Sequence, residues 1–146
     1  MYYDHALLLG LDGNVYSVGS NKWGQLGLGH QIEAPNINKV DKFDLIEVLK
    51  VQVGWESSAV LTKNGEVCVF GKWGEEGFIS SLLALYNLQL WGDKTIYTEP
   101  HLIEGLTGVV DISMGGDHIL ALTEDKEILQ ISAGNSHSLI KYKTKQ

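Results

Sequence analysis

The sequence predicts an all-β fold of small stacked sheets, and three observations predict it. Seventeen of the 146 residues are glycine and two are proline, a composition typical of chains with many tight turns. Short apolar runs meet an Asp-Gly or Asn-Gly pair and continue as alternating strands, which indicates β-hairpins. The hairpin pattern also recurs along the chain, so the same structural unit is expected more than once.

Three segments carry the hairpin pattern. Residues 5–27 (HALLLGLDGNVYSVGSNKWGQLG) align with residues 57–77 (SSAVLTKNGEVCVFGKWGEEG), and residues 118–129 (HILALTEDKEIL) match the first half. Each segment is expected to form two antiparallel strands joined by a two-residue type I′ turn, in which both central residues take positive φ. The turn pairs are Asp12-Gly13, Asn64-Gly65 and Asp125-Lys126. The third pair fits this geometry least, because lysine resists positive φ.

A further short strand is expected before each hairpin, in residues 46–54, 109–116 and 129–135. The last of these begins a near-copy, because ISAGNSHSL (131–139) repeats ISMGGDHIL (112–120) at an offset of 19 residues. We therefore expect a new repeat to begin there, with the second half of the third repeat skipped.

The glycine-rich stretch NKWGQLGLGH (21–30) raises the alternative of a phosphate-binding loop. Such a loop requires a preceding buried strand, a following helix and usually a Lys-Ser or Lys-Thr pair, none of which this stretch provides. The tripeptide KWG also recurs at 72–74, as expected for repeating architecture and not for a unique ligand loop. The stretch is therefore interpreted as part of the repeat.

The pattern of strand, Asp-Gly, VYSVGSNKWGQLGLG (15–29), proline, strand and Gly-x-x-His closely resembles the regulator-of-chromosome-condensation (RCC1-type) repeat family. The match is most specific across 5–29, partial across 54–77, and returns across 101–139. The resemblance implies β-propeller blades of four strands, in a family that normally closes a ring of about seven.

The chain has material for about two and a half to three blades of such a ring. We expect one partial propeller domain over residues 1–146, with repeats at about 1–45, 46–108 and 109–146 and an insertion at 78–94. Both ends depart from the family pattern, as in a fragment, a shortened gene product or a subunit. An open stack leaves apolar faces and strand edges exposed, so another copy, a different protein or a longer chain is expected to cover them.

The insertion has the pattern of an amphipathic helix near 79–91. Its apolar residues follow helical spacing: Ile79, Leu82, Leu83, Tyr86 and Leu90. The favoured interpretation is a helix that covers its own propeller. The alternatives are a docking element for a partner groove, through Leu83, Tyr86 and Leu90, or an extra strand.

Superposition of the repeats places Asp4, Glu56 and Asp117 at equivalent positions on one rim. One interpretation is an acidic arc that binds a basic partner surface. The more common alternative is that each carboxylate accepts hydrogen bonds from a local turn. Trp55, next to Glu56, is a candidate interface anchor, since exposed tryptophans are often interaction hot spots.

His5, His118 and His137 share one repeat position, which favours a structural hydrogen bond over catalysis. Their spacing carries no metal-ligand signature, and no nucleophile motif or paired carboxylates occur. Neither a metal, a cofactor nor enzymatic turnover is therefore expected. Trp23 and Trp73 are equivalent residues that are expected to pack between blades.

The formal charge of −7 argues against non-specific binding to nucleic acid or to an anionic membrane. A single cysteine excludes an internal disulfide and fits the cytoplasm or the nucleus. The leading functional hypothesis is a non-catalytic protein-interaction module or assembly subunit. The resemblance also implies an alternative, nucleotide exchange on a small Ras-like GTPase through Asp4, Glu56 and Asp117. A third possibility is a piece of a longer repeat protein without separate activity.

Overall fold

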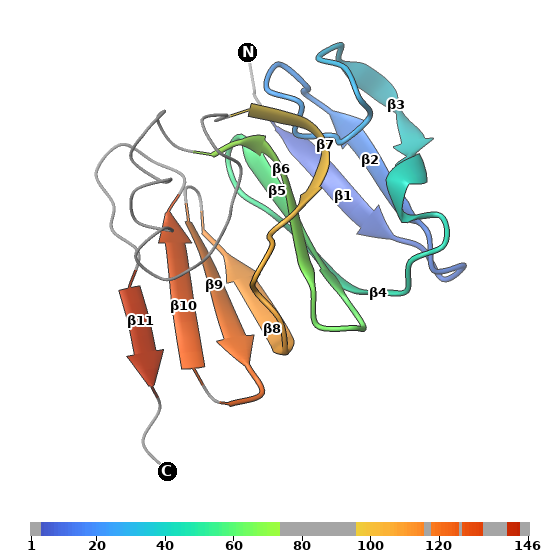
Figure 1. Ribbon diagram of the computed structural model, residues 1–146. Coiled ribbons are helices and arrows are strands. Elements are labelled where there is room, and N and C mark those ends of the chain that lie inside the picture. Colours follow the sequence, from blue (N-terminus) through green and yellow to red (C-terminus); the bar gives the residue numbers. More distant parts are fainter. Residues whose placement is uncertain (1–3, 74–95, 116–117, 126, 133–139, 144–146) are drawn as a thin grey trace.

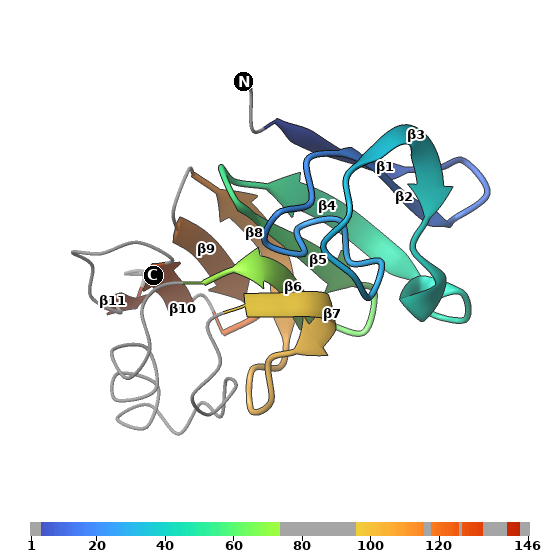
Figure 2. The same cartoon turned by 90° about the horizontal axis from the view of Figure 1, so that it is seen from above.

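The computed structural model describes residues 4–73, 96–115, 118–125, 127–132 and 140–143. These residues form three antiparallel sheets that lie side by side and fan outward, as the two perpendicular views show (Figures 1 and 2). The predicted all-β fold of partial propeller type is confirmed. No helix among the described residues is both long enough and apolar enough to span a membrane.

The first blade is a three-stranded sheet in the order β1-β2-β3. It consists of β1 (His5–Leu9), β2 (Val15–Gly19) and β3 (Ala34–Lys39). A short 3-10 helix, η1 (Asp41–Phe43), follows β3 and begins the connection to the next sheet.

The second blade has four strands in the order β4-β5-β6-β7. They are β4 (Val48–Val53), β5 (Ser57–Thr62), β6 (Val67–Lys72) and β7 (Ile96–Leu102). All six residues of β5 and the first five of β6 are buried, so this blade forms the centre of the described core.

The third blade has four strands in the order β8-β9-β10-β11. They are β8 (Val109–Met114), β9 (His118–Thr123), β10 (Glu127–Ser132) and β11 (Ile140–Lys143). β8 contacts β4 and β5, which stacks this blade on the second.

The prediction that a new repeat begins at residue 131 is wrong. β10 pairs with β9 along Ile128–Ser132, and β11 pairs with β10, so both strands belong to the third blade. The reason is local: β10 pairs antiparallel with β9, the strand before it in the chain, and this pairing uses the backbone N–H and C=O groups of β10.

The predicted type I′ turns are also wrong. The Gly13 N–H donates to the Gly10 carbonyl at 2.9 Å, so Leu11 and Asp12 are the central residues and Gly13 follows them at φ 85°. The second hairpin repeats this geometry with Gly65 donating to Thr62. Both hairpins therefore have three-residue loops with glycine in the left-handed position, a common alternative to the two-residue turn. Lys126 and the predicted helix near 79–91 lie outside the described residues.

The first and second blades have equivalent strand registers, because His5 pairs with Gly19 and Ser57 pairs with Gly71. Each glycine has positive φ and lies against the backbone of the preceding strand. The pairs therefore define matching positions in the two sheets, and a position that the two blades share in this way is called a slot.

Matching slots differ in burial. Leu8 occupies the slot of Val60, and Val18 occupies the slot of Phe70. Val60 and Phe70 are fully buried, whereas Leu8 is 43% exposed and Val18 is half-buried. Among the described residues, the face of the first blade that carries Leu8 and Val18 therefore has no covering blade.

Candidate partner-binding rim

The glycine-rich loop of residues 21–30 folds around the buried side chain of Asn21. Its carbonyl oxygen accepts the Leu26 N–H at 3.0 Å, and its amide nitrogen donates to the carbonyls of His30 at 2.8 Å and Ile32 at 3.0 Å. The buried Ser17 hydroxyl also donates to the Leu26 carbonyl at 2.9 Å. These bonds give the buried side chains of Asn21 and Ser17 the partners that buried polar groups require.

This loop covers one face of the second blade. Gly27 lies against the ring of Phe70, where an added Cβ would be 3.0 Å from the ring carbons. Gly24 lies against the backbone of Thr98 in β7, and the Gly29 N–H donates to the Thr98 carbonyl at 2.9 Å. The glycines thus permit close approach between blades, in agreement with a structural repeat and not with a phosphate-binding loop.

His5 links the first blade to the second. Its Nε2 lies 2.8 Å from the Ser58 hydroxyl, which donates to the Gln25 carbonyl at 2.7 Å. Since the hydroxyl has one proton and gives it to Gln25, Nε2 is the donor to Ser58. Burial lowers the pKa of His5 to about 4, against the opposing effects of a Ser57 backbone bond and the Asp4 charge. The structural role predicted for this histidine is confirmed; the His118 side chain and His137 lie outside the described residues.

Asp4 and Glu56 have equivalent backbone roles at the predicted rim. The Asp4 carbonyl accepts the Ser20 N–H at 3.1 Å, and the Glu56 carbonyl accepts the Lys72 N–H at 2.9 Å. Their carboxylates differ, because Asp4 is exposed whereas Glu56 is half-buried. Asp117, the third member of the predicted arc, lies outside the described residues.

The Glu56 carboxylate contacts the first blade as well as its own. One oxygen accepts the Trp23 indole N–H at 3.0 Å, and the other lies 3.8 Å from the Lys72 ammonium. Lys72 also lies over the Trp23 ring, 4.4 Å from its centroid, and Lys22 lies 5.1 Å from the same centroid. Trp23 thus joins the two blades, as expected, and Glu56 holds it there.

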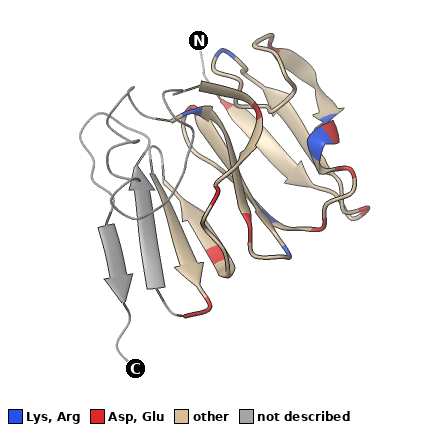
Figure 3. Cartoon of the chain, viewed as in Figure 1, with Lys and Arg blue, Asp and Glu red and all other residues tan. Residues whose placement is uncertain are grey.

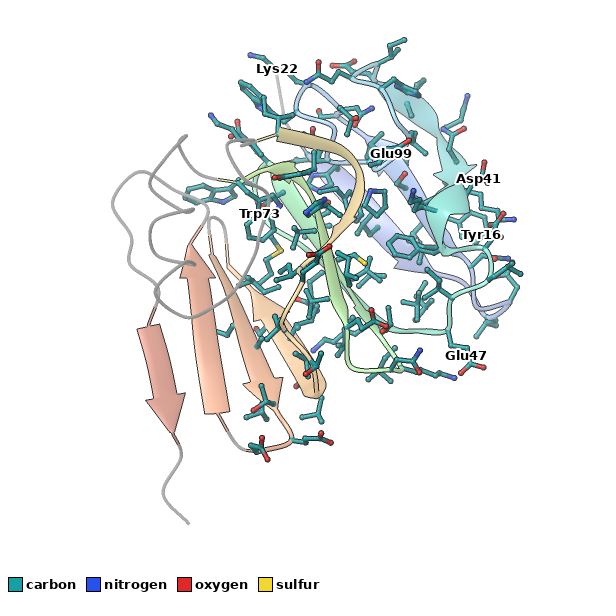
Figure 4. The ribbon with its side chains drawn as sticks, in the orientation of Figure 1. Tyr16, Lys22, Asp41, Glu47, Trp73 and Glu99 are labelled. Atoms are coloured by element: carbon teal, nitrogen blue, oxygen red, sulfur yellow. The ribbon has the colours of Figure 1, made fainter. Side chains whose placement is uncertain are left out.

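Trp73, the equivalent tryptophan of the second blade, is fully buried and donates its indole N–H to the Phe70 carbonyl at 2.9 Å. Figure 4 shows Trp73 and Lys22 at the same end of the described sheets. Trp55, by contrast, is 73% exposed, and Val53 beside it is also exposed. Among the described rim residues, Trp55 and Asp4 are therefore the two whose side chains face solvent.

The described carboxylates, histidines and cysteine are dispersed over the sheets. No group of three or more His, Cys, Asp or Glu side chains gathers there in a way that could hold a metal ion. Figure 3 shows the described carboxylates spread over all three sheets. Leu83, Tyr86 and Leu90, predicted as a partner-binding helix, lie outside the described residues.

The sequence did not predict a hollow that the structure contains beside η1. A hollow of about 540 Å³ lies between the η1 segment and the second blade, and its lining includes Phe43, Cys68 and Leu102. The available signal was the length of the connection between repeats. Residues 40–47 join the first two blades, whereas the shorter 103–108 join the next two.

Comparison with known proteins identifies the repeat. Residues 12–61 match the family described as "Regulator of chromosome condensation (RCC1) repeat". The chain is 34% identical over 119 residues to the E3 ubiquitin-protein ligase HERC2 of Mus musculus, covering 80% of this chain and 2% of that protein. It is 29% identical over 136 residues to the Regulator of chromosome condensation of Xenopus laevis, covering 92% and 30%. The chain thus spans between 2% and 30% of the length of these two relatives.

A solved structure shares the fold. The crystal structure of Prp20p from Saccharomyces cerevisiae, a protein described together with its binding properties to Gsp1p and histones, superposes with a TM-score of 0.74. The superposition covers 99% of this chain and 37% of Prp20p, at 14% sequence identity. At that identity the likeness concerns the arrangement of strands.

Proposed function

Because this chain belongs to the RCC1-type repeat family, we propose that it is a non-catalytic protein-interaction module or assembly subunit. It would work by packing the open face of its first blade against a further repeat blade. That blade would come from a second copy, from another repeat protein or from more repeats of a longer chain. The single, buried and unpaired cysteine fits work in the cytoplasm or the nucleus.

The open face of the first blade supports this proposal most directly. Leu8 and Val18 occupy slots that are fully buried in the second blade, where Gly27 of the loop of residues 21–30 lies against Phe70. Contact between an apolar face of this kind and water is unfavourable in free energy. A blade whose own glycine-rich loop covered it would remove that cost.

The rim adds a second surface. Trp55 is exposed on the rim beside Val53, and an exposed tryptophan on a rigid framework is a favoured binding anchor. The framework is rigid because His5, Ser58, Trp23 and Glu56 bond the blades to one another. We propose Trp55 and Asp4 as the partner-binding residues of the rim, with Asp117 as a further candidate.

The native mass of the purified chain tests the proposal. Light scattering over a range of concentrations should give a discrete oligomer, and Leu8→Asp should shift it to a monomer. Ile32→Asp, at an exposed loop position away from the strand face, is the matched control and should leave the mass unchanged. A wild-type monomer that unfolds cooperatively at every concentration would contradict packing between copies of this chain.

Guanine-nucleotide exchange is a second candidate, favoured by the likeness to Regulator of chromosome condensation and by the binding of Gsp1p described for Prp20p. Exchange through the rim would use Asp4 and Asp117, because the Glu56 carboxylate already holds Trp23. Catalytic amounts of the chain should then accelerate loss of labelled nucleotide from Gsp1p, and Asp4→Ala should slow it. Stoichiometric binding without acceleration, weakened by Trp55→Ala, would support the interaction module instead.

A further inference from the structure

The hollow between the first two blades lies at the opposite end of the sheets from the rim. Figure 4 shows Glu47, one of its lining residues, at the far end from Lys22 and Trp73. Its volume of about 540 Å³ lies within the range of ligand pockets. Its walls are the connection that contains η1, the turn between β5 and β6, and the end of β7.

The connection between the first two blades makes this hollow. It begins where the Val40 N–H donates to the Val15 carbonyl at 2.8 Å, as the next connection begins where Ile103 donates to Val67 at 2.9 Å. From these matching points the first connection has eight residues (40–47) and the second has six (103–108). The hollow therefore depends on a feature of this chain that the repeat does not dictate.

Apolar side chains form the floor of the hollow and part of its edge. Phe43 is buried beneath it, with its ring 6.4 Å from that of Phe70, so the floor is anchored in the core. Leu45 is fully exposed, and Ile46 and Leu102 are exposed by about two fifths (40% and 39%). Exposed aliphatic side chains around a firm aromatic floor suit an apolar side chain from a partner.

Carboxylates surround this apolar surface. Glu47, Glu66 and Glu104 line the hollow, against one lysine, Lys42. Within the described chain, Glu66 and Glu104 form no ion pair, and Glu47 reaches Lys63 only at 3.9 Å with both side chains largely exposed. The excess of negative charge favours a cationic partner, since complementary charge steers and orients association.

A second hollow of about 500 Å³ continues the first along β7. The two share Lys42, Pro100 and His101, and the second adds Glu99 and the strand residues from Ile96 onward. β7 is an edge strand of the second blade in the described sheet. A groove that runs beside an edge strand fits an extended segment better than a compact ligand.

We propose that this groove binds an extended segment of a partner protein in which an apolar side chain is flanked by lysine or arginine. The apolar side chain enters the hollow above Phe43, and the basic side chains meet Glu66 and Glu104 on one side and Glu99 on the other. The inference adds a second site to the interaction module and rests on that function only in treating the chain as a binding protein. It shares no residue with the rim.

A fluorescent hexapeptide of alternating lysine and apolar residues, Lys-Leu-Lys-Val-Lys-Leu, tests the groove by anisotropy with the full chain. It should bind, whereas Glu-Leu-Glu-Val-Glu-Leu and Lys-Ser-Lys-Ser-Lys-Ser should bind at least about 10-fold more weakly, because one lacks the charge and the other the apolar contacts. Glu66→Lys and Glu104→Lys should each weaken binding by about 5-fold. The control Glu33→Lys reverses an exposed carboxylate outside the groove and should have no effect.

A second pair of variants tests the apolar contacts between the groove and the peptide. Leu45→Asp should weaken binding by about 10-fold, whereas Leu11→Asp, equally exposed in the first hairpin turn, should not. Cys68, the only cysteine of the chain, lines the hollow, so the bound peptide should slow its alkylation. The reaction is run at alkaline pH, because burial raises the pKa of this thiol to about 11.

Three results would overturn the inference: no binding of the cationic peptide, equal binding of the acidic one, or equal losses in the groove and control variants. Self-association that Leu45→Asp abolishes would also overturn it, because a second copy would then be the occupant. Trp55→Ala separates the two proposals. It should leave peptide binding unchanged, so a failure at the rim and a failure at the groove are distinguishable.

Discussion

The first and second blades carry the same hairpin in two different surroundings. In the second blade, Val60 and Phe70 are fully buried, and Gly27 of the loop of residues 21–30 lies against the Phe70 ring. In the first blade, Leu8 and Val18 hold the same slots, and Leu8 is 43% exposed. The repeat sequence thus sets which slots are apolar, and the neighbouring blade decides whether they are buried.

The contacts between the first and second blades are polar as well as apolar. The Ser58 hydroxyl bonds His5 and the Gln25 carbonyl, and Glu56 bonds the Trp23 indole, so two side chains of the second blade hold three residues of the first. In the first blade the slot of Ser58 is occupied by Ala6. The Ser58 slot is therefore polar at this junction and apolar on the open face of the first blade, whereas the slots of Val60 and Phe70 are apolar in both blades.

Truncation of the side chains in two equivalent slots, Phe70 and Val18, gives the largest expected difference in the free energy of unfolding. Phe70→Ala should lower the free energy of unfolding by about 3–5 kcal/mol, because it leaves a cavity in a closely packed site, and Val18→Ala by about 1 kcal/mol or less. Chemical denaturation measures both. Phe70→Leu, a milder change, keeps the comparison possible where the alanine variant fails to fold. Equal losses would mean that the first blade's outer face is covered in solution.

Two glycines with positive φ give the next comparison. Gly71 has φ 90°, and an added Cβ would lie 2.9 Å from the Ser57 Cα, whereas Gly13 has φ 85° and no atom within 4 Å of that position. Gly71→Ala should cost about 2–4 kcal/mol, because a clash adds to the backbone strain, and Gly13→Ala about 1 kcal/mol from strain alone. Thermal unfolding compares them. A cost at Gly13 that matched the cost at Gly71 would show that the clash contributes little.

Exchange of the residues in the Ser58 slot is the third test. Ser58→Ala should lower stability by about 1–3 kcal/mol, because the His5 Nε2–H and the Gln25 carbonyl lose a buried partner. The reciprocal change, Ala6→Ser, lies on the open face and should stay within about 0.5 kcal/mol of wild type. Urea denaturation checks the pair. A neutral Ser58→Ala would contradict the bonded relay between blades.

The sequence predicted the strands of these hairpins well, because alternating residues and glycine turns are local signals. It identified the loop of residues 21–30 as repeating structure and Trp23 as a residue between blades. It did not predict the turn geometry. The Asp12-Gly13 pair fits both a two-residue and a three-residue loop, and the hydrogen bond from the Gly13 N–H to the Gly10 carbonyl shows the three-residue form. It also did not predict β11 as the fourth strand of the third blade.

The candidate site was less predictable for a physical reason. Glu56 meets Trp23 across 33 residues of chain, and only the angle between two blades brings the carboxylate to the indole. No periodicity in the sequence encodes that angle. The groove beside β7 was missed in the same way, because it arises where a connection with two more residues than the next one folds as η1 against the second blade.

The smallest expected effect concerns pH at the junction of the two blades. Burial lowers the pKa of His5 in the folded chain to about 4, below its ordinary value of 6.5. The folded state therefore prefers the neutral imidazole, so the stability from this residue is complete above pH 6.5 and decreases as pH falls from 6.5 towards 4. The upper limit of the loss by pH 4 is about 3 kcal/mol, and partial exposure reduces it to about 1–2 kcal/mol. His5→Gln retains a donor to Ser58 but has no charge to gain, so its unfolding free energy should fall less steeply over the same range. Parallel pH profiles for the two proteins would mean that His5 has the same pKa in the folded and unfolded chains, so that burial does not disfavour its charged form.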